Sequence, residues 1–256
     1  MSVAPTAEPF VVDAVPNSQD GQRVGVLLVQ GFTGSPASMV PWGHYLSEHG
    51  LGVSVPRLPG HGTSWHELNR TRWADWYGEV DRAFEKLRAN HDQVVVGGLS
   101  MGGGLVLQLA ADRGRDVAGI VLVNPAVSTE RKDVLALPVL KHVARSLPGI
   151  ANDIKKPGVE EHGYTRTPLK AAHSMMSSWK LLREDLPKVT QPMLMFLSRE
   201  DHVADQSSAR IIRGAVSSRD LSERMLENSY HVATLDNDAP IIFEESAEFI
   251  RRVTGP

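Results

Sequence analysis

The stretch "GGLSMGGG", residues 97–104, places one serine among five glycines. It follows the branched apolar run 94–96 and precedes the aliphatic run 105–111. A strand that turns abruptly into a helix needs small residues on both sides of the turn, because a Cβ there would collide with the neighbouring backbone. The stretch therefore predicts a strand, a sharp turn and a helix, with the side chain of Ser100 held at the apex.

Gly98 and Gly102 flank Ser100 in the G-x-S-x-G spacing, which in this context predicts a nucleophilic serine. The hydroxyl would lie at the start of a helix, where the backbone N–H of Met101 is free to stabilise an oxyanion. A phosphate-binding turn and a serine that only packs are the alternatives. A dinucleotide-binding turn is disfavoured, because no G-x-G-x-x-G opens a helix with a suitably placed acidic residue downstream.

Short segments rich in Val, Leu and Ile alternate with segments of helical spacing along the chain. This alternation predicts an α/β fold with a doubly wound, mostly parallel sheet, whose ligand crevice lies beyond the carboxyl ends of the strands. The expected strands are 25–32, 51–60, 92–100, 118–126 and 192–201, followed by a strand-like segment at 222–230. The expected helices are 36–50, 71–90 and the run after Met101.

Residues 128–185 interrupt the alternation, since they contain four prolines and no clear strand. An ordinary helical connection and a cap over the crevice are both consistent with such an insertion, and its position after a strand end favours the cap. We therefore expect an α/β core formed by 1–127 and 186–256, with 128–185 as a cap.

Composition excludes several classes of function. The chain has 256 residues, a formal charge of -3 and no cysteine, so disulfides, thiolate metal sites and a cysteine nucleophile are excluded. No stripe of basic residues is present, so nucleic acid is not expected as a partner.

The N-terminus lacks a basic start followed by a long apolar run, and no eighteen apolar residues are contiguous, so we expect a cytoplasmic protein. A monomer or homodimer with at most transient membrane contact through the cap is expected.

A serine nucleophile needs a base and a carboxylate that orients the base, and in this fold class the chain order is Ser, acid, His. Asp201, in "SREDHV", follows an expected strand, and His231 lies in "ENSYHVATLDND" near the C-terminus. These two positions fit the order. The rival acids are Glu200 and Asp205, and the rival histidines are His61, His173 and His202.

A second oxyanion donor is expected from the loop "QGFTGSPASM", residues 30–39. Gly31 and Gly34 allow a tight turn around Phe32, whose backbone N–H would act beside that of Met101. A strand-to-helix turn with Thr33 or Ser35 as the N-cap is the simpler interpretation, and both can hold together.

The chain resembles the α/β-hydrolases and, among them, the bacterial monoacylglycerol lipases and the related small thermostable carboxylesterases. The resemblance extends from about Gly25 to the C-terminus. One departure is visible, because these relatives usually have histidine where this chain has Gln30. The similar stretches are "GFTGSPASM", "PRLPGHGT", "GLSMGG", "LPGIANDIK", "GVEEHGYTRTP", "SREDHV" and "SYHVATLDND".

The resemblance implies a glycerol pocket beneath the cap. It assigns Glu161 to contact with glycerol hydroxyls and Ile150 to an apolar position where the cap narrows over the site. From the residues alone, Glu160 and Glu161 would be taken for a solvated acidic pair. The aliphatic residues of the cap are consistent with shelter for an acyl chain or with packing of the cap on the body. They are Val134, Leu137, Val139 and Leu140.

The expected function is hydrolysis of monoacylglycerols through an acyl-enzyme, without metal or organic cofactor. The principal alternative is a short- to medium-chain carboxylesterase, which would share every catalytic residue. A hydrolase-fold enzyme of another class, such as a C–C bond hydrolase or a cofactor-free perhydrolase, and a non-catalytic binding protein remain further alternatives.

Overall fold

The computed structural model describes residues 3–16 and 21–255. Part of the N-terminal stretch on which the expected location rests, residues 1, 2 and 17–20, lies outside them. In the described residues the main sheet has seven strands in the order β1-β3-β2-β4-β5-β8-β9, all parallel except β1, which pairs antiparallel with β3. Its strands are β1 (Phe10–Val12), β2 (Val24–Val29), β3 (Gly52–Val55), β4 (Gln93–Leu99), β5 (Gly119–Val123), β8 (Met193–Ser198) and β9 (Leu221–Leu226).

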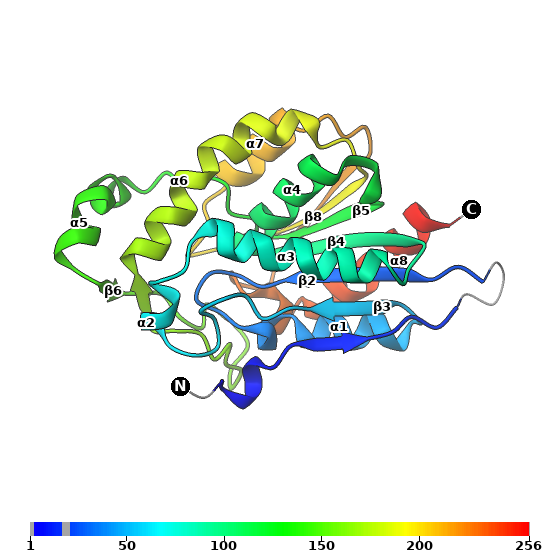
Figure 1. Ribbon diagram of the computed structural model, residues 1–256, viewed down its shortest axis with the longest axis horizontal. Helices are drawn as coiled ribbons and strands as arrows, with labels where there is room; N and C mark the ends of the chain where they lie inside the picture. The colour runs from blue at the N-terminus through cyan, green and yellow to red at the C-terminus, as the bar shows by residue number, and fades with distance from the viewer. Residues whose placement is uncertain (1–2, 17–20, 256) are drawn as a thin grey trace.

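Helices cover both faces of this sheet (Figure 1). Helices α1 and α8 pack on one face, and α3, α4 and α7 pack on the other. The α-helices are α1 (Val40–Glu48), α2 (Trp65–Leu68), α3 (Trp73–Arg88), α4 (Met101–Arg113), α5 (Leu137–Val143), α6 (Leu169–Asp185), α7 (Ser207–Ala215) and α8 (Ala239–Thr254). The 3-10 helices are η1 (Pro5–Ala7), η2 (Pro36–Ser38), η3 (Gly114–Asp116), η4 (Lys132–Ala136), η5 (Leu186–Lys188) and η6 (Ala233–Leu235). The expected α/β-hydrolase architecture, a mostly parallel sheet with flanking helices, is confirmed.

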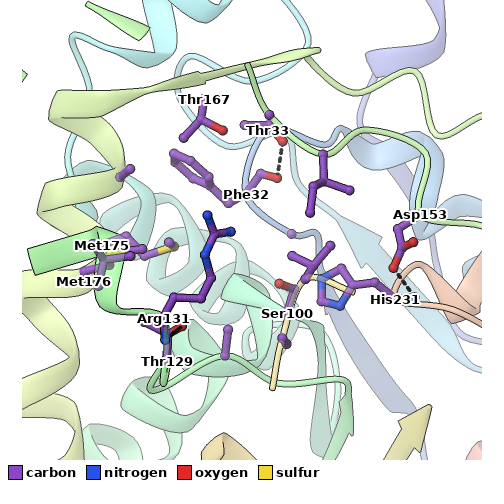
Figure 2. Close-up of a pocket in the computed structure, with 18 of the residues that line it drawn as sticks. Phe32, Thr33, Ser100, Thr129, Arg131, Asp153, Thr167, Met175, Met176 and His231 are labelled. Atoms are coloured by element: carbon purple, nitrogen blue, oxygen red, sulfur yellow. Dashed lines mark hydrogen bonds between the residues drawn. The ribbon is translucent and has the colours of Figure 1, made fainter. Parts of the chain in front are cut away.

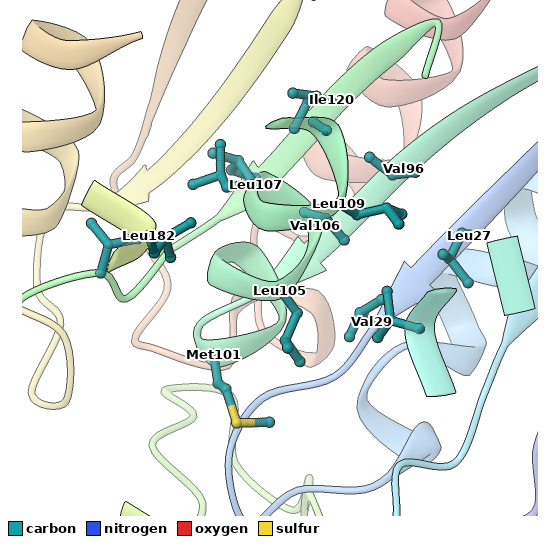
Figure 3. Close-up of a cluster of buried hydrophobic side chains, with 14 of the residues drawn as sticks. Leu27, Val29, Val96, Met101, Leu105, Val106, Leu107, Leu109, Ile120 and Leu182 are labelled. Carbon is teal, nitrogen blue, oxygen red and sulfur yellow. The ribbon is translucent and has the colours of Figure 1, made fainter. Parts of the chain in front are cut away.

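Helix α4 lies at the centre of the larger apolar core (Figure 3). Its residues Met101, Leu105 and Leu109 have no exposed surface. A helix that is apolar on all sides must be covered on all sides, and α4 lies between the sheet on one side and α3 and α6 on the other. This burial fixes the N-terminal end of α4 relative to the strands.

Ser100 joins β4 to α4 with a backbone φ of 55° and ψ of −118°, a conformation that L-residues rarely adopt. The two flanking glycines allow the backbone to pack tightly around this turn. A Cβ on Gly98 would overlap the backbone of Gly102, and a Cβ on Gly102 would overlap the carbonyl oxygen of Val29. The helix can therefore approach the strands closely enough to hold Ser100 at the apex.

Residues 128–185, which we call the cap segment, contain η4, α5, α6 and two short strands that pair antiparallel. These strands are β6 (Ser146–Pro148) and β7 (Arg166–Pro168). No strand is clear in the sequence of this segment, because each of these strands has only three residues and ends at a proline, which gives little sequence signal. Figure 1 shows α5 and β6 at one end of the molecule, away from the body of the sheet. Leu182, near the end of α6, joins the main core.

We expect Gly102→Ala to lower the free energy of unfolding by more than about 2 kcal/mol, because the added methyl group overlaps fixed backbone atoms. Gly214→Ala in α7 is the matched control, since nothing lies within 4 Å of the added Cβ. It should be neutral or stabilising by up to about 1 kcal/mol. Urea unfolding of both variants checks this, and equal free energies of unfolding would contradict the packing argument.

Candidate active site

A cavity of about 430 Å³ lies between the cap segment and the strand ends (Figure 2). Ser100, His231 and Glu161 line it. Figure 2 shows Met175 and Met176 of α6 on the far side of the cavity from Ser100 and His231. Its apolar part is formed by Leu137, Leu140, Leu169, Ala172, Met175, Met176 and Trp179. The cavity thus joins a polar end at the nucleophile candidate to an apolar compartment under the cap segment.

His231 and Asp201 form a nearly buried pair at the polar end. The distance from His231 Nδ1 to Asp201 Oδ2 is 2.8 Å. The other oxygen of Asp201 accepts hydrogen bonds of 2.8 Å from the backbone N–H groups of Val203 and Ala204. The carboxylate is therefore fixed at both oxygens and can hold one orientation of the imidazole.

The pKa of His231 lies above its ordinary value. Burial alone would lower this pKa, but the charge of Asp201 and its hydrogen bond oppose burial and, together with Glu161 and Asp153, raise it. Negative charge around the ring favours the imidazolium that forms when a histidine removes a proton. The site thus stabilises the charge that general-base catalysis creates.

The rival acids and histidines make other contacts. Glu200 is exposed and pairs with Lys155, while Asp205 accepts hydrogen bonds from the backbone N–H groups of Glu130 and Ser207.

The rival histidines are also engaged elsewhere. His61 is buried with its ring edge-on to Phe32 and Trp76, and burial lowers its pKa to about 4. His173 lies beside Lys141 and Ser177, and His202 pairs with Asp153. None of these groups contacts the ring of His231 in the described part of the chain.

The loop after β2 approaches Ser100 closely. A Cβ on Gly31 would lie 3.3 Å from the Cβ of Ser100, so only glycine fits there without displacement. In residues 3–16 and 21–255, the backbone N–H groups of Phe32 and Met101 have no hydrogen-bond acceptor. The N–H of Ser100 itself is bonded to the carbonyl of Val123. Phe32 and Met101 therefore remain the two candidate oxyanion donors.

Gln30 lies beneath this loop with no exposed surface. Its amide Nε2 donates a hydrogen bond of 3.2 Å to the carbonyl of Gly34 and so ties the two ends of the turn together. Ser35 also caps η2 by accepting a hydrogen bond from Ala37 N–H, so the simpler N-cap interpretation holds as well. The side chain of Gln30 thus supplies a hydrogen bond that shapes the loop.

Glu161 is the unusual charge of the cavity. Its side chain is buried, whereas that of Glu160 is 67% exposed. Neither carboxylate oxygen of Glu161 has a hydrogen-bond partner in the described chain, and a Cβ on Gly34 would lie 2.6 Å from Oε1. Burial raises the pKa of Glu161 from 4.5 to about 7, opposed by the charge of His231. An unpaired buried carboxyl of this kind indicates a site for a hydrogen-bond donor from outside the chain.

The aliphatic residues of the cap segment divide into two groups. Ile150, Val134, Leu137 and Leu140 line the cavity, and Ile150 is half exposed. Val139 is 69% exposed and does not line the cavity. Most of these side chains are thus placed where an acyl chain would lie.

Asp153 was not singled out by the sequence. Its side chain lines the cavity and accepts a hydrogen bond of 3.1 Å from the backbone N–H of His231. The contact joins residues 78 positions apart, so no local pattern indicates it. In the described residues no group of three or more His, Cys, Asp or Glu could hold a metal ion.

Comparison with known proteins agrees with this geometry. The model of the family described as "Serine aminopeptidase, S33" matches residues 21–172. A thermostable monoacylglycerol lipase of Bacillus sp. (strain H-257) is 38% identical over 253 residues, 97% of this chain and 96% of that one. A carboxylesterase of Bacillus subtilis (strain 168) is 27% identical, covering 95% and 98%. A solved structure from work on the metagenome-derived lipolytic enzymes LipS and LipT has a TM-score of 0.92, at 38% identity and 98% and 100% coverage.

Asp201→Asn should lower kcat by about 10⁴-fold, because an amide cannot hold His231 in the tautomer that accepts the Ser100 proton. Asp205→Asn is the control, since Asp205 accepts hydrogen bonds from the backbone N–H groups of Glu130 and Ser207 and makes no contact with the histidine ring in the described residues. Steady-state hydrolysis of a p-nitrophenyl ester measures both variants. Similar losses in the two would mean that Asp201 is not the orienting acid.

Glu161→Gln should raise the melting temperature by several degrees at pH 8.5 and by less at pH 5. The raised pKa of Glu161 means that its ionisation opposes folding, so stability is lost as pH rises from about 4.5, the ordinary pKa, to about 7, the pKa in the folded protein. A shift of this size corresponds to at most about 3 kcal/mol. Thermal unfolding at the two pH values, with exposed Glu160→Gln as control, tests this. The same change at both pH values would contradict the buried charge.

Proposed function

Because the chain belongs to the serine aminopeptidase S33 family of α/β-hydrolases and is a serine hydrolase, we propose that it cleaves the ester bond of monoacylglycerols to glycerol and a free fatty acid. The observation that carries this proposal is the unpaired, buried carboxyl of Glu161 in the same cavity as Ser100, His231 and an apolar compartment. One cavity thus offers a nucleophile, a group for a polyol and room for a chain.

The proposed mechanism is acyl transfer in two steps. His231, oriented by Asp201, removes the proton of Ser100 as its hydroxyl attacks the ester carbonyl. The N–H groups of Phe32 and Met101 stabilise the oxyanion of the tetrahedral intermediate. His231 then protonates the departing glycerol, and water attacks the acyl-enzyme by the same sequence to release the fatty acid.

Recognition of the head group follows from hydrogen-bond chemistry. The free hydroxyls of a monoacylglycerol donate hydrogen bonds that a simple alkyl ester lacks, and an ionised carboxylate accepts them with charge assistance. Because Glu161 is buried, we expect a second or third acyl chain on the glycerol to be excluded from the space beside it. The pocket therefore favours a polyol with a single acyl chain.

A carboxylesterase of broader specificity would share the triad and both oxyanion donors. Such an enzyme has no need of an unpaired buried carboxyl, whose ionisation costs stability. The relatives at 38% identity are a monoacylglycerol lipase and a lipolytic enzyme, whereas the carboxylesterase is less similar. Both observations favour the lipase.

The outer surface of the cap segment carries apolar side chains. Leu135, Val139 and Val143 are 80%, 69% and 77% exposed and lie in η4 and α5, next to the cavity-lining residues. We include in the proposal a transient contact of this surface with lipid, through which a monoacylglycerol would enter the cavity. No helix in the part of the chain that the structure describes is long and apolar enough to cross a membrane.

Glu161→Ala should lower kcat/KM for a monoacylglycerol by about ten- to a hundredfold, because the variant loses a charged hydrogen-bond acceptor. At a pH where His231 is neutral in both proteins, a p-nitrophenyl ester of the same acyl chain should react at nearly the wild-type rate. Glu160→Ala, at the exposed neighbouring position, should leave both substrates unaffected. The ratio of the two kcat/KM values for each variant is the measurement.

Two outcomes would contradict the proposed function. Equal losses on both substrates would mean that Glu161 supports the triad or the cap segment rather than the head group. A wild-type enzyme that prefers simple esters or aminoacyl amides to monoacylglycerols would be a carboxylesterase or an aminopeptidase.

A further inference from the structure

The loop that carries His231, residues 227–238, is bound to residues 153–156 of the cap segment. The backbone N–H of Val232 donates a hydrogen bond of 3.0 Å to the carbonyl of Asp153, beside the bond from His231 N–H to the Asp153 side chain. We call residues 227–238 the histidine loop. Two consecutive N–H groups of the histidine loop are thus held by a single residue of the cap segment.

Asp236 makes the reciprocal connection. Its carboxylate accepts hydrogen bonds of 2.7 Å and 2.9 Å from the backbone N–H groups of Lys155 and Lys156. It also accepts a bond of 2.9 Å from the N–H of Tyr230, the residue before the histidine. The backbone is therefore fixed on both sides of His231. Val232 is bonded directly to Asp153, and Tyr230 is bonded to Asp236, which in turn holds Lys155 and Lys156.

The side chain of Asp153 has a further partner that fixes its own orientation. Its Oδ1 lies 2.8 Å from Nδ1 of His202, and its Oδ2 accepts a longer bond of 3.3 Å from the backbone N–H of His202. His202 is half exposed at the rim, with its ring edge-on to Tyr230. The carboxylate of Asp153 is only 9% exposed, so it is held between the rim and the histidine loop.

We propose that Asp153 is a positioning residue for the catalytic base: its carboxylate holds the backbone of His231, so the cap segment, as well as the core, sets the geometry of the triad. The proposal rests on the role of His231 in the proposed function. It does not require that the substrate be a monoacylglycerol, since the contact is to the enzyme's own backbone.

Asp153 acts on His231 in two separable ways. The first is the hydrogen bond, which a neutral amide oxygen can also accept. The second is the negative charge, which raises the pKa of His231 together with Asp201 and Glu161. Glu200 and Lys155 also lie near this group. At the exposed rim Glu200 contacts both His202 and Lys155, and Lys155 lies over the ring of Tyr230.

The experiment compares Asp153→Asn and Asp153→Ala with Asp205→Asn in the full-length enzyme. Asp205 is a suitable control because it also accepts a bond from the cap segment, at Glu130, but none from the histidine loop. Three quantities are measured: kcat and KM for a p-nitrophenyl ester, the rate at which a fluorophosphonate labels Ser100, and the dependence of kcat/KM on pH.

Asp153→Ala should lower kcat and the labelling rate together by about ten- to a hundredfold with little change in KM, because the base is misplaced rather than the substrate. Asp153→Asn should keep most of the labelling rate at high pH. Its acidic limb of kcat/KM should move to lower pH, because loss of the charge lowers the pKa of His231 and the active form is the neutral imidazole. Asp205→Asn should change none of these.

A rise in KM with unchanged labelling would overturn the proposal, since it would make Asp153 a substrate contact. Equal effects of Asp153→Ala and Asp205→Asn would also overturn it. If Asp153→Ala does not fold, Asp153→Ser takes its place, because its shorter side chain cannot reach the backbone N–H of His231. An unchanged labelling rate in that variant rejects the proposal. Labelling of Ser100 is independent of substrate preference, so failure of the lipase assignment leaves this test intact, whereas a wild-type protein that is not labelled refutes the proposed function first.

Discussion

The close approach of α4 to the backbones of β2 and β4 is the constraint on which the site depends. It requires glycine at positions 98 and 102, and it holds Ser100 at a positive φ at the end of the central strand. The same approach brings the loop after β2 against Ser100, where a Cβ on Gly31 would lie only 3.3 Å from the Cβ of Ser100. Nucleophile and both candidate oxyanion donors are therefore placed by one packing contact between a helix and two strands.

Burial has opposite consequences for Glu161 and His231, two ionisable groups that line the same cavity. It raises the pKa of Glu161, which has no hydrogen-bond partner in the described chain, while the pKa of His231 rises despite burial because carboxylates surround the ring. Each charge favours the ionised form of the other. Binding of hydroxyl donors by Glu161 would therefore also change the pKa of His231, because both groups line the same cavity.

Much of this arrangement could be predicted from sequence, because the decisive signals are local. The flanking glycines of Ser100 leave few structures open, and chain order selects Asp201 and His231. The burial of Glu161 could not be predicted from the residues alone, since Glu160 has the same chemistry and is exposed, and only the resemblance to the lipases singled it out. Asp153 was missed because its contact is non-local, and β6 and β7 because three-residue strands ending in proline have no periodicity. These missed features all lie in the cap segment, whose contacts with the core and within itself join residues far apart in the sequence.

The mutual hydrogen bonds between residues 153–156 and the histidine loop have a consequence for how such enzymes diversify. An inserted segment attached only at its two ends could be exchanged between relatives by recombination to change the acyl compartment. Here Asp153 belongs to the inserted segment and Asp236 to the histidine loop of the core, and each accepts hydrogen bonds from the backbone of the other's loop. A new segment must therefore arrive with a matching histidine loop, and variation in specificity is easier to achieve through η4, α5 and α6, which line the cavity without bonding to the base.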